Sequence, residues 1–188
     1  MPRLRSAVIL MGLALLAVGL GGLAVADPFH LRYAKWYTVG AVFLAIALVT
    51  AAFAVVARRG LLRGFVLVVG VVALAGWIVV VLLVMRVQVG NREVSEVDDG
   101  GRRLLVLQAY PSLDPSYAVV VRAGSGPFEQ ESLVYQGVPD ALAPVAIRFV
   151  DSGTVEVQAA GGCTYRSEIE GGTLAVSPVH RPLRIDAC

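Results

Sequence analysis

Ionisable side chains are missing from three long stretches of this chain of 188 residues. Residues 6–26, 36–57 and 65–85 contain no Asp, Glu, Lys, Arg or His. A helix of that length reaches roughly 32 Å, about the thickness of the hydrocarbon layer of a bilayer. A soluble helix as long as this would carry a polar stripe. The sequence therefore excludes an ordinary soluble protein and predicts three transmembrane helices over these ranges.

The same absence argues against a transporter or a channel. Ion and proton pathways place ionisable or several polar side chains inside the membrane. Here the stretches offer little more than the hydroxyls of Ser6, Thr38 and Thr50. We therefore expect the helices to anchor the protein or to dock against other helices.

Small side chains recur at intervals of four residues on the second stretch. Such residues let two helices approach closely in a membrane. They would serve either packing within the three-helix bundle or docking against another membrane protein. The candidate docking positions are Ala41, Ala45, Ala47 and Ala51.

Cysteine is scarce. Cys163 and Cys188 are the only two, and both lie in the C-terminal part of the chain. Two cysteines confined to one polar region predict a disulfide in an oxidising compartment. The alternatives are a metal site that includes His180, or two free thiols.

Positive charge gathers beside the apolar stretches. Residues 1–85 hold seven Lys or Arg and one acid, whereas residues 86–188 hold nine Arg and thirteen Asp or Glu. An acidic polar region excludes nucleic acid as a partner, and basic residues beside the spans are typical of the cytoplasmic side. The basic residues that determine the topology are Arg3, Arg5, Arg58, Arg59 and Arg63. The opposing residues on the other side are Arg32, Lys35, Arg86 and Arg92. The balance predicts a multi-pass protein of the plasma (inner) membrane with a cytoplasmic N-terminus and an extracytoplasmic C-terminal domain.

The first stretch has a second interpretation. Basic residues precede it, and Ala24-Val25-Ala26 before Asp27 resembles a cleavage site for a signal peptide. Its length and the span that follows it favour a retained helix. Cleavage would leave the topology of the later spans unchanged.

The polar C-terminal part reads as strands separated by turns. Short alternating runs lie between clusters of Gly, Pro, Asp and Ser, a pattern typical of a β-sandwich or a β-barrel. We expect a membrane domain over residues 1–88 and an all-β, sandwich- or barrel-like domain over residues 89–188. The predicted strands are Leu104–Tyr110, Tyr117–Arg122, Ser132–Gln136, Val145–Val150, Thr154–Gln158, Tyr165–Ile169 and Thr173–Ser177. Residues 86–97 fit either a helix extension or a first strand.

One hairpin is predicted most clearly, from Val145–Val150 to Thr154–Gln158 across the turn Asp151-Ser152-Gly153. Alternation places Phe149 on one face of it and Arg148 on the other. Glu129 and Glu131 alternate in the same way near a strand end, which is typical of a solvated strand face.

Catalytic motifs are lacking. The two histidines, His30 and His180, stand beside no nucleophile motif, and no phosphate loop or zinc spacing is present. The sequence assigns no catalytic, cofactor-binding or metal-binding residue. It favours a non-catalytic envelope protein that binds the lipid bilayer and either another membrane protein or an envelope component. The alternative is an accessory subunit or enzyme of lipid or envelope metabolism that uses His30, Arg32 or Lys35 at the outer interface.

Overall fold

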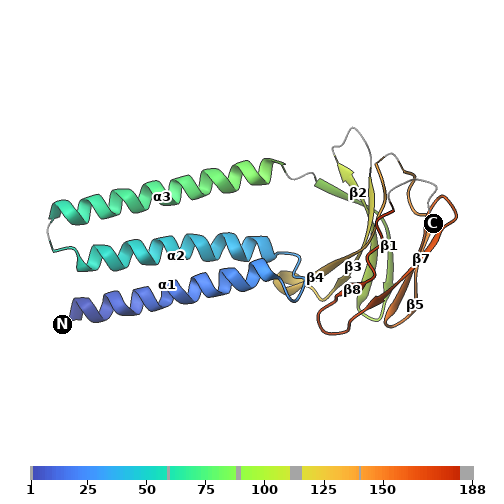
Figure 1. The fold of residues 1–188 in the computed structure, drawn as a ribbon, viewed down its shortest axis with the longest axis horizontal. Coiled ribbons are helices and arrows are strands. Elements are labelled where there is room, and N and C mark those ends of the chain that lie inside the picture. The colour runs from blue at the N-terminus through green and yellow to red at the C-terminus, as the bar shows by residue number, and fades with distance from the viewer. Residues whose placement is uncertain (1, 59, 88–89, 111–115, 140, 183–188) are drawn as a thin grey trace. The chain divides into compact units, whose positions relative to one another are not determined.

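The computed structural model describes residues 2–58, 60–87, 90–110, 116–139 and 141–182. Over these residues three helices come first and eight strands follow (Figure 1). The predicted order of long apolar helices and then strands is confirmed. The chain divides into a helical unit, Met1–Asp27 with Ala34–Gln88, and a β unit, Pro28–Tyr33 with Val89–Cys188. The loop between the first two helices therefore belongs with the strands.

The helices are α1 (Pro2–Ala26), α2 (Ala34–Val56) and α3 (Gly60–Val87), and all three are long and apolar enough to cross a membrane. Each begins before its predicted span. Arg63 lies inside α3, although it was predicted in the preceding loop. The prediction ended each span at a charge, but arginine is a good helix former and its long side chain can reach water from within a helix.

Helix α2 lies between α1 and α3 (Figure 1). Small residues set both contacts, since a Cβ built on Gly21 of α1 would lie 3.2 Å from the Cβ of Ala41 in α2. A Cβ built on Gly70 of α3 would lie 2.9 Å from the Cβ of Thr50 in α2. The second distance is too short for two side-chain carbons, so a larger residue at position 70 would displace Thr50 or move the two helices apart.

The strands form two antiparallel sheets of four, in the orders β1-β2-β3-β4 and β5-β6-β7-β8. The first sheet contains β1 (Gly90–Asp99), β2 (Arg102–Tyr110), β3 (Tyr117–Ala123) and β4 (Gln130–Gln136). The second contains β5 (Ala146–Asp151), β6 (Thr154–Gln158), β7 (Thr164–Ile169) and β8 (Val176–Ser177). The 3-10 helix η1 (Gly126–Phe128) precedes β4.

Local turn chemistry explains the two best-defined hairpins. Gly100 and Gly101 join β1 to β2 with φ of 55° and 85°. A tight hairpin turn requires such positive values, and residues with a side chain rarely adopt them. The predicted hairpin from β5 to β6 is confirmed, with Arg148 opposite Glu156 and Phe149 opposite Val155. Asp151 closes its turn by accepting a hydrogen bond from the Gly153 amide at 2.7 Å.

Two segments depart from the sequence-based expectations. Residues 86–97, which fitted either a helix extension or a first strand, contain the end of a helix and most of a strand, because α3 runs to Val87 and β1 begins at Gly90. The last predicted strand is shorter than expected, with β8 limited to Val176–Ser177. Leu174 is instead buried with a φ of 59°, so the chain turns where the strand was predicted.

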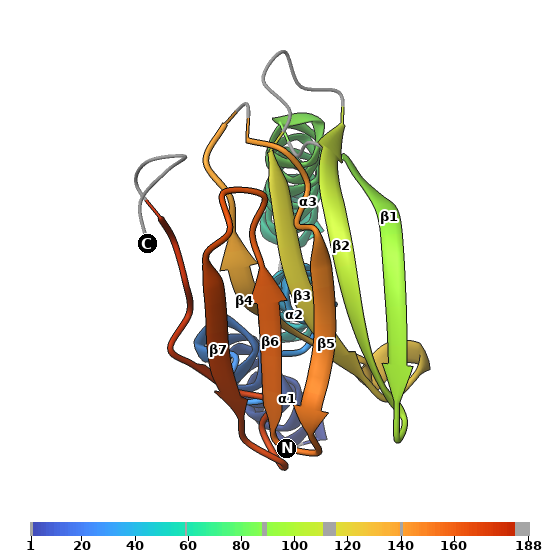
Figure 2. The same cartoon turned by 90° about the vertical axis from the view of Figure 1, so that its right-hand side faces the viewer.

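Buried side chains of both sheets make up one apolar cluster. It joins Leu104, Val106, Val119, Val121 and Val134 of the first sheet to Val155, Val157 and Ile169 of the second. Burial of one such aliphatic side chain contributes roughly 1.5–3 kcal/mol. The sheets lie in two layers (Figure 2). The face of the first sheet that points away from this cluster is called its outer face below.

Candidate functional site

The loop between α1 and α2 is paired with the beginning of β4. The Arg32 amide donates to the Glu129 carbonyl at 2.9 Å, and the Glu131 amide donates to the His30 carbonyl at 2.8 Å. Leu31 and Gln130 form an antiparallel bridge between these two bonds. The loop thus occupies part of the β4 edge, which would otherwise present unpaired amides.

The backbone of His30 has a φ of 49°, a conformation that residues other than glycine seldom adopt. Its Nδ1 lies 3.1 Å from the Thr173 carbonyl. Because a carbonyl only accepts, the imidazole proton must be on Nδ1. The ring therefore joins the loop to the turn before β8, and the side-chain and backbone bonds together offset the backbone strain.

Charged side chains on and beside the first sheet form one ion-pair network. It links arginines and glutamates of the loop and of all four strands or their flanks, and it consists of Arg32, Arg103, Arg122, Glu93, Glu96, Glu129 and Glu131. Glu129 stands at one branch, where it pairs with Arg32 and, at 2.5 Å, with Arg103. Glu131 stands at the other, 2.6 Å from Nε of Arg122 and 3.8 Å from Nε of Arg32.

Strand register places these charges on the outer face. Leu104 and Val121, which face the core, are paired across β2 and β3, and so are their outward neighbours Arg103 and Arg122. Arg122 is in turn paired with Glu131 on β4. Since side chains alternate along a strand, the three charged residues share one face.

Two members of the network are almost fully buried. Glu129 is 4% exposed and Arg122 is 5% exposed. Glu129 was expected on a solvated strand face, and that expectation is wrong. The alternation was read correctly, but loop residue Arg32 covers the carboxylate from outside the sheet. A buried charge is tolerated only with partners, so the loop and the sheet stabilise each other.

The pKa of Glu93 follows from its place in the network. Its carboxylate accepts a hydrogen bond from the Arg122 guanidinium, which is the main reason that its pKa lies below the usual 4.5. The charges of Arg122, Arg32 and Arg103 act in the same direction, against partial desolvation. Glu93 therefore remains ionised at neutral pH.

A cavity of about 460 Å³ adjoins the network on the outer face. Its apolar floor includes Leu107 and Val120, which belong with Leu105 to a second buried cluster. Polar residues line the rest, with Glu131 at the boundary to the network. The lining is Asn91, Leu107, Ser116, Tyr117, Ala118, Val120, Glu131, Leu133 and Gln136. A mixed concave surface of this kind is typical of a small-molecule site.

The face of the second sheet that points away from the apolar cluster carries a simpler charge arrangement. Arg148, Glu156 and Arg166 are paired across β5, β6 and β7. Arg166 donates to Glu156 at 2.8 Å and Arg148 donates to the other carboxylate oxygen, also at 2.8 Å. These hydrogen bonds, that of Arg166 first, lower the pKa of Glu156. The two arginines are exposed, so this ladder is a surface feature.

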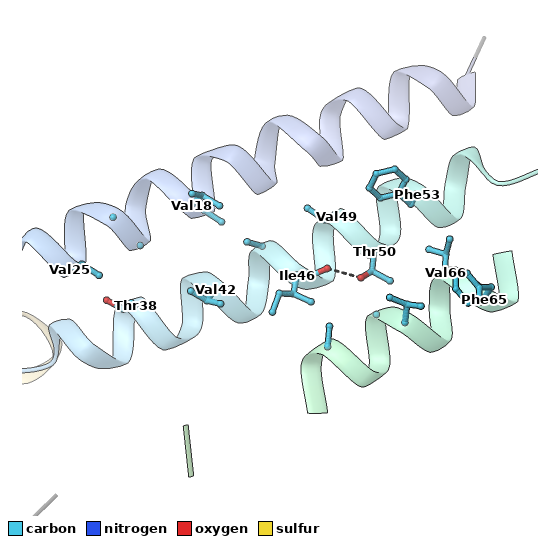
Figure 3. A pocket seen from close by; sticks show the side chains of 17 residues that line it. Val18, Val25, Thr38, Val42, Ile46, Val49, Thr50, Phe53, Phe65 and Val66 are labelled. Carbon is cyan, nitrogen blue, oxygen red and sulfur yellow. Dashed lines mark hydrogen bonds between the residues drawn. The ribbon is translucent and has the colours of Figure 1, made fainter. Parts of the chain in front are cut away.

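The helical unit contains a larger groove of about 790 Å³ between its helices (Figure 3). Its lining comes from all three helices and is apolar except for Thr38 and Thr50. Thr50 donates to the Ile46 carbonyl at 2.8 Å and Thr38 to the Ala34 carbonyl at 3.2 Å. Both hydroxyls thus bond to their own helix, and the groove presents a hydrocarbon-like surface.

The candidate docking alanines occupy different environments on α2. Ala45 is buried and lines the groove, and Ala41 lies against Gly21 of α1. Ala47 and Ala51 are half-buried. Docking of another protein at these positions stays a prediction.

Four of the residues that were predicted to determine topology lie at or beside helix ends. Arg3 and Arg5 are exposed in α1, Arg63 is exposed in α3, and Arg58 follows α2. Arg59 lies outside the described residues. The orientation of the spans stays a prediction.

The predicted disulfide involves one described residue. Cys163 is buried in the connection from β6 to β7, where its carbonyl accepts a hydrogen bond from Ala159 at 2.8 Å. Cys188 lies outside the described residues. His180 directs Nε2 to the Arg166 carbonyl at 2.9 Å. Within the described part of the chain, no three His, Cys, Asp or Glu side chains gather in a way that could hold a metal ion.

Sequence reasoning missed the network and the cavity. The available signal was the placement of Arg103, Arg122 and Glu131 at outward positions of apolar strands, which by itself indicates only a wet face. No family model, curated protein or solved structure matches this chain.

Proposed function

We propose that the protein is a non-catalytic, multi-pass protein of the plasma (inner) membrane whose β unit lies outside the cytoplasm and binds an envelope component. We also infer that the two sheets form a sandwich, an inference supported by the apolar cluster that they share. The chain crosses between the two units three times, at residues 27–28, 33–34 and 88–89. A β unit tethered in this way suits a binding module that stays at the membrane.

The cavity on the outer face of the first sheet carries this proposal. Asn91 and Gln136 offer amide donors and acceptors beside an apolar floor. The charge of Glu131 is balanced by Arg122 at 2.6 Å. The cavity therefore suits an uncharged group with one apolar side and one hydrogen-bonding edge. Its wall is held firmly, because Glu131 also belongs to the network that includes Arg32.

Two of the three residues of the enzyme alternative, His30 and Arg32, are engaged elsewhere. His30 bonds to the Thr173 carbonyl, and Arg32 pairs with Glu129. A catalytic role would require these side chains to leave partners that hold the loop on the sheet. Binding therefore fits the described contacts better than catalysis does.

Photocrosslinking in intact cells tests the binding site. A benzophenone amino acid at position 116, in the cavity lining, should yield a discrete adduct, whereas the same residue at position 148, on the second sheet, should not. Ala118→Leu, which fills the cavity from its lining, should abolish the adduct. Equal labelling at both positions would count against this site. Turnover of a lipid-linked substrate that depends on His30 or Arg32 would instead support the enzyme alternative.

The orientation has its own test. A reporter that is active only outside the cytoplasm, fused after Cys188, should be active in intact cells. A thiol probe at position 58, between α2 and α3, should be protected from an impermeant reagent. The reverse pattern would invert the proposed topology and leave the helices themselves unaffected.

A further inference from the structure

Two phenylalanines of the β unit are exposed on adjacent segments. Phe128, the last residue of η1, is 73% exposed, and Phe29, in the loop between α1 and α2, is 50% exposed. An aromatic side chain that stays in water does not gain the free energy that removal of its apolar surface from water would provide. Both residues belong to the β unit, so their proximity can be followed within that unit.

Hydrogen bonds hold the two segments together. The Gln130 side chain donates from Nε2 to the Phe29 carbonyl at 2.8 Å. Gln130 is two residues after Phe128, and the intervening Glu129 pairs with Arg32 of the loop. The turn before β4 is thus joined to the loop by both side-chain and backbone contacts.

The turn that carries Phe128 is ordered by its backbone. Gly124 and Gly126 adopt φ of 78° and 69°, which let the chain reverse direction between β3 and β4. The Glu129 amide donates to the Gly126 carbonyl at 3.2 Å and closes the turn. Phe128 is therefore presented on a defined turn and loses little conformational entropy on binding.

Chain connectivity places Phe29 close to the end of a candidate membrane span. Helix α1 ends at Ala26 and α2 begins at Ala34, so Phe29 is three residues from the end of one candidate span. If these helices cross a bilayer, the loop lies where hydrocarbon meets water. Trp and Tyr are enriched in that region, Phe is among the side chains that insert at the boundary between headgroups and acyl chains, and Trp36 at the start of α2 is also exposed.

We propose that Phe128 and Phe29 form one aromatic contact with the interfacial region of the bilayer, so that the turn before β4 is a membrane anchor of the β unit. The occupant is the boundary between phospholipid headgroups and acyl chains. Continuity with the helix ends supports this partner. The inference rests on the membrane location in the proposed function, but not on the orientation or the ligand cavity.

Fluorescence quenching of the full chain in bilayers tests the anchor. Phe128→Trp is made in a background of Trp36→Phe and Trp77→Phe, and the protein is reconstituted in phosphatidylcholine vesicles with or without brominated acyl chains. The matched control is Leu142→Trp, because Leu142 is 77% exposed in the β unit and lies beside the connection from β6 to β7. Brominated lipid should reduce the emission of the Phe128→Trp protein about twofold, as expected for a ring at the interface. Aqueous iodide should quench mainly the Leu142→Trp protein.

A third protein separates the possible failures. The Trp36→Phe variant retains Trp77 within α3, and brominated lipid must quench it if the helices are in the bilayer. Quenching of Trp77 together with equal iodide access at positions 128 and 142 would overturn the anchor alone. Loss of Trp77 quenching would overturn the membrane location as well. Protection of position 128 from both quenchers would indicate a protein partner or a second copy and would also reject the lipid contact.

Discussion

Arg32 in the loop between α1 and α2 is ion-paired with Glu129 at the start of β4, 97 residues away in the chain. Only 4% of Glu129 is exposed, so the pair is largely removed from water on the carboxylate side. One backbone hydrogen bond joins the same two residues, and a second joins Glu131 to His30. The short loop is therefore an integral part of the β unit.

Removal of Arg32 should loosen the β4 edge. In Arg32→Ala, Glu129 keeps Arg103 but loses its second cationic partner, which should cost about 1–3 kcal/mol of unfolding free energy. Hydrogen exchange measured by mass spectrometry on the full chain in detergent should show faster exchange at the backbone amides of positions 32 and 131. Arg92→Ala, an exposed arginine of β1 outside the network, should change stability by less than about 0.5 kcal/mol. Unchanged protection in Arg32→Ala would mean that the backbone pairing alone holds the loop.

A methyl group on Gly70 should separate α2 from α3. Its Cβ would overlap the Thr50 side chain, and overpacking of this kind costs about 1–3 kcal/mol. Gly76→Ala is the control, because a Cβ there meets no atom within 4 Å. Trp77 donates to the Val39 carbonyl at 3.3 Å, so its emission in a Trp36→Phe background reports on this interface.

Gly70→Ala should shift that emission and Gly76→Ala should not. Adding Thr50→Ala to Gly70→Ala removes the hydroxyl and methyl groups and should recover part of the shift. If Gly70→Ala alone behaves like the control, the close contact between α2 and α3 is not required.

Local signals carried the successful part of the sequence prediction. The spans followed from the absence of charge, and the β5–β6 hairpin followed from alternation around the turn at Asp151. The start of α3 at Gly60 was missed because a charge ends an apolar run without ending a helix. Periodicity within a segment could not reveal the partners of the loop.

The candidate site was harder to predict because its parts are distant in the chain. Arg32 and Glu129 each have an unremarkable local context, and their pairing depends on how the β4 edge is covered. The cavity likewise combines Asn91 of β1 with Ser116 and Gln136 from segments further along the chain. Sequence alternation indicates which side chains share a face, but not which loop covers that face.

Acid should destabilise the β unit partly through Glu93. Its pKa is lowered in the folded protein, chiefly by the hydrogen bond from Arg122. The carboxyl therefore contributes stability that is complete above its unfolded pKa, near 4.5, and is lost as the pH falls through the lower folded value. Urea unfolding of the β unit, followed by circular dichroism, should show Glu93→Gln to be less stable than wild type at pH 7. The two curves should approach each other as the pH falls below 4.5 and meet below the folded pKa of Glu93.

Glu168→Gln is the matched control for this measurement, since it removes an exposed carboxylate of β7 outside the network. It should not reproduce the convergence. A constant difference between wild type and Glu93→Gln across the whole pH range would show that the hydrogen bond of Arg122 does not act through ionisation.

Oxidation of Cys163 to Cys188 is the prediction that bears most directly on compartment. Closing the chain between these positions would stabilise the β unit by about 3 kcal/mol on the chain-entropy account. Cys163 is buried, so alkylation must be performed in denaturant without reductant to keep burial from imitating oxidation. Mass spectrometry should then find neither cysteine modified in protein from freshly isolated membranes, and both modified after reduction.

Cys163→Ser and Cys188→Ser should each weaken the β unit, while the double variant should be no worse than either. Membrane insertion should be unaffected, because α1, α2 and α3 contain no cysteine. Two alkylated thiols before reduction would reject the disulfide and remove one of the two arguments for an extracytoplasmic β unit.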